Sequence, residues 1–99
     1  MGDYESEIIE KDLTAPRVTP NQVEEAIGRE DYYVFPNSTT TVCMLTLKNG
    51  FTVIGESACA SESNFDAEIG RRIARDNAKQ KIWMLEGYAL KNRLQGIAV

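Results

Sequence analysis

The sequence predicts an α+β fold in which a three-stranded antiparallel meander packs with one short N-terminal helix and one long C-terminal helix. A capping pattern at Thr19-Pro20 introduces a short amphipathic segment. Runs rich in Thr, Val and Leu then flank an Asn49-Gly50 pair, and a long segment with helical periodicity closes the chain. Local helices separated by a strand meander indicate α+β rather than alternating α/β order.

The chain of 99 residues corresponds to a single domain. Residues 1–18 form an acidic arm that we expect to be poorly ordered, because acids surround only Ile8, Ile9 and Leu13 there. We expect residues 19–99 to fold as the α+β domain. The net charge of −4 is concentrated toward the N-terminus, since residues 32–99 hold eight bases and six acids. The folded part therefore suits an anionic ligand better than the net charge indicates.

The first helix is predicted over Pro20–Ile27. Thr19 is a good N-cap, proline suits the first helical position, and Gln22 completes a capping box. Gly28 is expected to end the helix.

Three strands are predicted, over Tyr32–Phe35, Thr39–Leu47 and Phe51–Ala58. Asn49-Gly50 predicts a two-residue type I′ hairpin turn with positive φ at both residues.

The two-residue turn places Cys43 opposite Glu56 and Cys59 opposite Thr40. Residues directly opposite share a face and faces alternate along a strand, so this register points the two cysteines to opposite sides of the sheet. We therefore expect two free thiols, which agrees with a reducing compartment.

The long helix is predicted from about Phe65 to Leu94, with Ser63 and Asp66 as a capping box. A face rich in small residues is expected to lie close on the sheet, with Ile73 and Ile82 flanking it. It consists of Ala67, Gly70, Ala74, Ala78, Leu85 and Tyr88.

A second apolar stripe lies on the other side of the helix, at Trp83, Gly87, Leu90 and Leu94. A helix that is apolar on two sides is usually buried on both, so we interpret the stripe as an interface between subunits. The alternative is that the N-terminal helix folds over it.

The composition argues against an enzyme. Histidine is absent, which removes the commonest general base and metal ligand, and no nucleophile motif or metal-ligand spacing is present. We therefore expect no catalytic residue, metal or cofactor. No apolar run approaches the ~18 residues of a membrane span, and the acidic N-terminus is unlike a signal peptide. We expect a cytoplasmic protein without a membrane partner.

Binding residues are instead predicted near the start of the long helix. Asn64 lies where free backbone N–H groups attract anions, and the basic residues Arg71, Arg75 and Lys79 follow. Phe51 offers a ring on which a base can stack. Together they suit a small anionic nucleotide, whereas the acidic arm disfavours polymeric nucleic acid. The simpler roles, Asn64 as a helix cap and Phe51 as part of the core, remain open.

Four segments resemble a known family of small tailed-phage and prophage proteins. They are the run from Thr39 to Val53, the run Glu56-Ser-Ala-Cys, the run Asn64-Phe-Asp-Ala-Glu-Ile-Gly, and the run Ile82-Trp-Met-Leu-Glu-Gly-Tyr. The similarity spans about Tyr32 to Leu94.

That family in turn resembles the phage sponge proteins that defeat the bacterial Thoeris defence. The resemblance implies an oligomer, from a dimer up to a hexamer, in the cytosol of the bacterial host. It implies sequestration of a cyclic ADP-ribose isomer, and in some members of cyclic oligonucleotides, without cleavage. It transfers only Asn64 and Phe51 as ligand contacts. The competing hypothesis is an interaction protein that docks on a host or phage protein through the Trp83 face.

Overall fold

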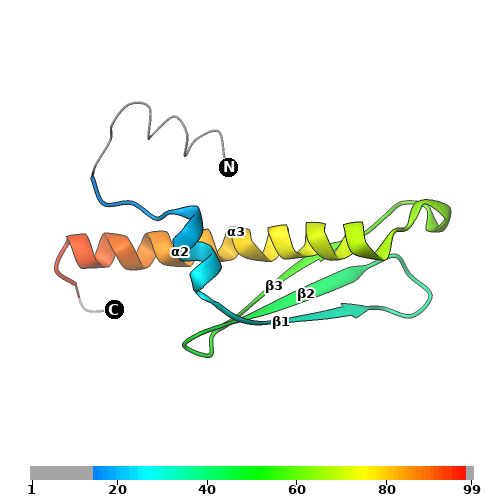
Figure 1. Cartoon of the computed structure of the whole chain (residues 1–99), viewed down its shortest axis with the longest axis horizontal. Helices are drawn as coiled ribbons and strands as arrows, with labels where there is room; N and C mark the ends of the chain where they lie inside the picture. The colour runs from blue at the N-terminus through cyan, green and yellow to red at the C-terminus, as the bar shows by residue number, and fades with distance from the viewer. Residues whose placement is uncertain (1–14, 98–99) are drawn as a thin grey trace.

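The computed structural model describes residues 15–97, and it confirms the predicted fold class. The three strands form one antiparallel sheet in the order β1-β2-β3, with α3 packed on β2 and β3 and with α2 beside it (Figure 1). In chain order the elements are α2 (Pro20–Glu25), β1 (Ile27–Val34), β2 (Thr41–Leu47), β3 (Thr52–Ser57), the 3-10 turn η1 (Glu62–Asn64) and α3 (Ala67–Leu94).

The predicted arm over residues 1–18 falls mostly on residues 1–14, which lie outside the described part of the chain. Of the remainder, Val18 packs against the core. Within the described part of the chain, core contacts therefore begin just before α2.

Helix α2 has the predicted capping box. The Gln22 N–H donates to Thr19 Oγ1 at 3.2 Å, and the Thr19 N–H donates to Gln22 Oε1 at 3.0 Å. The helix ends at Glu25 rather than Ile27, because Ile27 already pairs with Leu47 in the sheet.

Strand β1 consequently begins at Ile27 and not at the predicted Tyr32. Gly28 does not cap a helix. It lies where the pairing with β2 shifts between Ile27 and Arg29, which is the position of a β-bulge. The charged run that follows, Arg29-Glu30-Asp31, has poor strand propensity, and pairing with β2 overrides it.

The predicted two-residue hairpin is wrong. The Leu47 N–H donates to Phe51 O at 2.7 Å and the Gly50 N–H donates to Leu47 O at 2.8 Å, so the loop has three residues, 48–50. Gly50 has a φ of 91°, whereas Asn49 is not among the described residues with positive φ. This is a type I turn followed by a left-handed glycine, the usual three-residue hairpin.

The longer loop shifts the register by one residue, so that Cys43 pairs with Gly55. Odd-numbered residues of β2 and β3 now share a face, so the predicted register is wrong and no longer supports placing the two cysteines on opposite faces. Both thiols are nevertheless free, because Cys43 is buried within the sheet and Cys59 lies beyond the end of β3. Burial raises the pKa of the Cys43 thiol.

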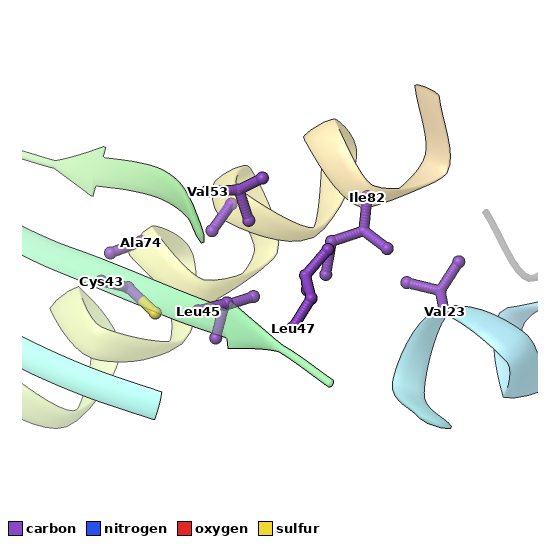
Figure 2. Close-up of a cluster of buried hydrophobic side chains, with 8 residues drawn as sticks. Val23, Cys43, Leu45, Leu47, Val53, Ala74 and Ile82 are labelled. Atoms are coloured by element: carbon purple, nitrogen blue, oxygen red, sulfur yellow. The ribbon is translucent and has the colours of Figure 1, made fainter. Parts of the chain in front are cut away.

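The core lies between α3 and one face of the sheet, with α2 closing one end (Figure 2). It consists of Val23, Cys43, Leu45, Leu47, Val53, Ala74, Ala78 and Ile82. Buried and half-buried side chains alternate along the whole of β2. The buried ones are Thr41, Cys43, Leu45 and Leu47.

Helix α3 approaches the sheet very closely at Gly55. A methyl group there would lie 2.2 Å from Ala78 N and 2.3 Å from Ala74 O. The predicted small-residue face is thus confirmed at Ala74 and Ala78. It is wrong at Tyr88, which is 70% exposed, because the last turns of α3 run past the end of the sheet (Figure 1).

Gly55→Ala should therefore destabilise the fold by at least about 2 kcal/mol, because the added methyl collides with helix backbone that cannot rotate away. Gly87→Ala is the matched control. Nothing lies within 4 Å of its added methyl, so replacing a mid-helix glycine should stabilise by ~0.5–1 kcal/mol. Urea unfolding followed by circular dichroism measures both. Equal midpoints for the two variants would contradict the packing described.

Candidate functional site

The segment between β3 and α3 is organised by Asp66. This carboxylate is the N-cap of α3, and its Oδ1 accepts from the N–H groups of Glu68 at 2.9 Å and Ile69 at 3.1 Å. The predicted cap at Ser63 is wrong, because η1 intervenes and the helix begins at Ala67. The Asp66 carboxylate already accepts from two of the helix N–H groups at which the sequence analysis expects an anion, and that anion site stays a prediction.

A pocket of about 240 Å³ lies beside this segment, on the β3 side of α3. Its apolar lining comes from Phe65, Ile69 and Ile73, and its polar lining includes Thr39, Ser57 and Asn64. Small-molecule binding sites usually have a mostly apolar lining with a few polar groups.

Hydrogen bonds hold the walls of this pocket in place. Thr39 Oγ1 donates to Cys59 O and accepts from the Cys59 N–H at 3.1 Å, which fixes the chain after β3. Ser57 Oγ donates to Gly70 O at 2.8 Å, which ties the end of β3 to the first turn of α3. The pocket is therefore built on two rigid elements.

The Asn64 side chain forms no hydrogen bond with any residue that the structure describes, and it is exposed. Because Asp66 caps the helix, the alternative in which Asn64 only caps is wrong. Its amide retains a donor and an acceptor for another partner.

The predicted basic residues do not line this pocket. Arg71, Arg75 and Lys79 are spaced four apart and so share one side of α3. Arg75 on that side hydrogen-bonds Glu24 of α2 and Glu30 of β1, both at 2.9 Å, and Lys79 Nζ lies 2.7 Å from Glu24. These two cations therefore hold α2 and β1 against α3.

The charges of these two cations lower the pKa values of the carboxylates that they contact. The Arg75 and Lys79 hydrogen bonds lower the pKa of Glu24 from 4.5 to about 2. The Arg75 hydrogen bond likewise lowers the pKa of Glu30. Arg71 forms no ion pair within residues 15–97 and is exposed, and it does not line the Asn64 pocket.

Phe51 lies at the opposite end of β3 from Asn64, in the β2–β3 hairpin (Figure 1). It is 55% exposed, so the alternative in which Phe51 fills the core is wrong. It lines a second hollow, of about 420 Å³, together with Ile54, Lys81, Met84 and Leu85. A single chain does not bring Phe51 and Asn64 together.

The sequence-based site also omitted Lys81, the cation beside Phe51. Helical spacing puts Lys81 four residues after Asn77, whose amide donates to Glu56 O of β3 at 2.8 Å. The sequence alone shows this spacing, but it does not show which side of α3 faces β3.

Trp83 is half-buried and packs against the core. It lines a hollow between α2 and α3 with Pro20 and Glu24, so the N-terminal helix lies beside it, as the alternative interpretation expected. Leu94, in contrast, is 55% exposed. An interface through Trp83, Gly87, Leu90 and Leu94 stays a prediction.

Within residues 15–97, no group of three or more His, Cys, Asp or Glu side chains is placed to hold a metal ion. No helix in the same range is long and apolar enough to cross a membrane.

In the Glu24→Gln variant, the free energy of unfolding should depend less on pH in the acid range. A carboxylate whose pKa is lowered in the folded state stabilises the fold above its unfolded pKa of 4.5, and this contribution is lost as pH falls toward 2. Because the group is partly exposed, we expect an effect below about 1 kcal/mol. Unfolding at pH 7 and pH 3 measures it. Glu25→Gln, which removes only a contact to Asn21 within α2, should retain the wild-type pH dependence; equal behaviour of the two variants would contradict the assignment.

The sequence model of the phage protein (N4 Gp49/phage Sf6 gene 66) family matches residues 18–94, which include every helix and strand described above. No match was found among curated proteins or among solved structures. The family match covers most of the chain, so this protein belongs to that phage protein family.

Proposed function

From this family membership and the Asn64 pocket, we propose that the protein is a phage anti-defence sponge. It binds a cyclic nucleotide immune signal, a cyclic ADP-ribose isomer or a cyclic oligonucleotide, and sequesters it in the host cytosol. The signal is held intact, and its free concentration falls because the protein is present in sufficient copies.

The observation that carries the proposal is the unpartnered Asn64 amide beside an apolar pocket. An amide can donate to and accept from the edge of a base, as an aliphatic side chain cannot. The aromatic ring of Phe65 in the same pocket offers a face for stacking. Since neither helix capping nor core packing requires Asn64 or Phe51, a ligand gives both residues a role.

The chemistry that the pocket offers supports the proposal of binding without cleavage. Asp66, which lines the pocket, is held as the helix cap. The Cys59 thiol lies 3.1 Å from Ser61 O, to which it donates, and a nucleophilic thiol would instead need an adjacent base. Hydrogen bonds and apolar contacts are what remain, and they suit reversible binding.

A second candidate function is docking on a host or phage protein through the Trp83 face. The exposed Leu94 at the end of α3, and the exposed Ile97 shortly after it, favour this function. Such a protein would take up no nucleotide.

The first test is to incubate the protein with cyclic ADP-ribose isomers and cyclic oligonucleotides, remove free ligand, and heat the protein to release what it holds. Return of the intact ligand, measured by mass spectrometry, is the expected result. An altered ligand would mean an enzyme, and no uptake from any probe would favour the docking function.

The second test is Asn64→Asp, which replaces the amide donor with a negative charge. We expect affinity for the bound nucleotide to fall about tenfold or more, since a hydrogen bond to a charged group is worth ~1.5–3 kcal/mol. Stability should change little, because Asn64 is exposed and does not cap α3. Calorimetry and thermal melting measure the two effects. Ser63→Asp, at the exposed neighbouring position, is the control for added charge, and equal losses in both variants would remove Asn64 from the site.

A further inference from the structure

One side of α3 is apolar from Trp83 to the end of the helix. Trp83, Gly87, Leu90 and Leu94 follow one another at intervals of four, three and four residues, which puts them on one side of the helix. These four residues make up the Trp83 face. The first three are half-buried, whereas Leu94 is 55% exposed. The described residues therefore cover this face less and less toward the end of α3.

The described residues also leave room on the Trp83 face at two places. A hollow of about 350 Å³ lies beside Trp83, between α2 and α3, with Pro20 and Lys79 in its lining. Further along the helix, a methyl group added at Gly87 would meet nothing within 4 Å. The gap between Trp83 and Leu90 can thus receive a large apolar side chain.

The end of α3 carries positive charge that no described carboxylate balances. Between Gly87 and Ile97 the charged side chains are Lys91 and Arg93, and both are exposed. Lys91 follows Leu90 and Arg93 precedes Leu94, so at helical spacing the two cations lie on opposite flanks of the Trp83 face. Neither forms an ion pair with another residue in the range 15–97. An acidic segment lying along this face would be attracted on both flanks.

Residues 1–14, which lie outside the described part of the chain, have the composition that this face requires. They hold five acids against one base, and large apolar side chains are interspersed with the acids. The acids are Asp3, Glu5, Glu7, Glu10 and Asp12, and the apolar side chains include Tyr4, Ile8, Ile9 and Leu13. The segment can therefore offer apolar groups to the Trp83 face and carboxylates to its flanks.

The chain enters the domain close to this face. Val18 packs against the core, and Pro20 lines the hollow beside Trp83. Figure 1 shows the chain before α2, drawn in blue, running toward the C-terminal end of α3. Leu94 lies only ~17 Å along the helix axis from Trp83, whereas fourteen residues span ~21 Å as a helix and up to ~46 Å when extended. Residues 1–14 can thus reach along the whole face in either conformation.

We propose that residues 1–14 bind along the Trp83 face of their own chain. Leu13, which is nearest to α2 in sequence, lies toward the hollow beside Trp83, and Ile8 and Ile9 lie toward Gly87 and Leu90. Carboxylates of the segment pair with Lys91 and Arg93. This contact lies within one chain, and it does not rest on the proposed function.

The contact bears on the second candidate function. A host or phage protein that docks through the Trp83 face would have to displace residues 1–14, and it would compete with a segment tethered beside its own binding surface. The Asn64 pocket lies at the start of α3, away from Trp83, and none of the four residues of the Trp83 face lines it. Residues 1–14 therefore cover the docking surface and leave that pocket open.

Charge reversal with rescue tests the ion pairs. Thermolysin cleaves before large apolar residues, and its rate within residues 1–14 follows the population in which the segment is released. Lys91→Glu with Arg93→Glu should raise that rate by about fivefold, as expected for the loss of exposed ion pairs. Adding Glu7→Lys and Glu10→Lys to this variant should restore the wild-type rate, because opposite charges again face each other.

Lys48→Glu with Lys81→Glu is the matched control. It changes the net charge by the same amount at two exposed positions that are not on the Trp83 face or its flanks. The control should be cleaved at the wild-type rate. Equal rates for the two charge-reversal variants, or no restoration by the added lysines, would overturn the proposal. Circular dichroism confirms that each variant is folded.

The apolar contact has its own test, because Trp83 is the single tryptophan of the chain. Ile8→Ser, Ile9→Ser and Leu13→Ser together should shift its emission to longer wavelength and make it more accessible to acrylamide. Ile54→Ser removes an apolar side chain that is 45% exposed on β3 and should leave the emission unchanged. An unchanged emission in the triple variant would contradict the contact.

A cross-link distinguishes the possible occupants of the face. Ile9→Cys with Leu90→Cys, in a Cys59→Ser background, should form a disulfide within one chain on mild oxidation. Ile9→Cys with Tyr88→Cys is the control, since Tyr88 is 70% exposed and lies on the other side of the helix, and it should not link. A disulfide between two chains would mean that a second copy supplies the segment. That result, no link at Leu90, or equal linking at both positions would each overturn the proposal.

Discussion

The close approach of α3 to β3 at Gly55 is the constraint on which the rest of the structure depends. The helix backbone at Ala74 and Ala78 rests on a strand position that has no side chain. This contact fixes the rotation of α3 about its own axis, and so decides which helix residues face which neighbour. Arg75 and Lys79 turn toward β1 and α2, while Ile73, Asn77 and Lys81 turn toward the free edge of β3.

Because of that rotation, the cationic side chains of α3 lie on two different sides of the helix. The cations on the α2 side are paired with Glu24 and Glu30, and they attach the N-terminal helix to the domain. Partly exposed pairs of this kind add little stability singly, but here one arginine and one lysine share carboxylates from two elements. On the β3 side of α3, Lys81 lines the hollows beside Phe51 and beside Glu56 but does not line the Asn64 pocket.

A domain of this size buries only a modest share of its surface. In the described part of the chain, β3 accordingly has no strand paired along its outer edge, and Ile54, Ile73 and Met84 are exposed.

The sequence by itself determined the elements and their order. Thr19-Pro20 and Gln22 defined the start of α2, the Thr/Val-rich runs defined β2 and β3, and the small residues Ala74 and Ala78 marked the face of α3 that packs on the sheet. These signals are local, since capping, β-propensity and helical periodicity act within a few residues.

Tertiary structure alone decided the register, the beginning of β1 and the composition of the site. The hairpin took a three-residue loop, and a change of one residue there moves every side chain of β3 to the other face. Strand β1 extended through a charged run because pairing with β2 outweighed local preference. The rotation of α3 against the sheet decides which residues Arg75 contacts, leaves the Asn64 amide without a partner, and separates Asn64 from Phe51. Contacts between residues far apart in the chain set that rotation.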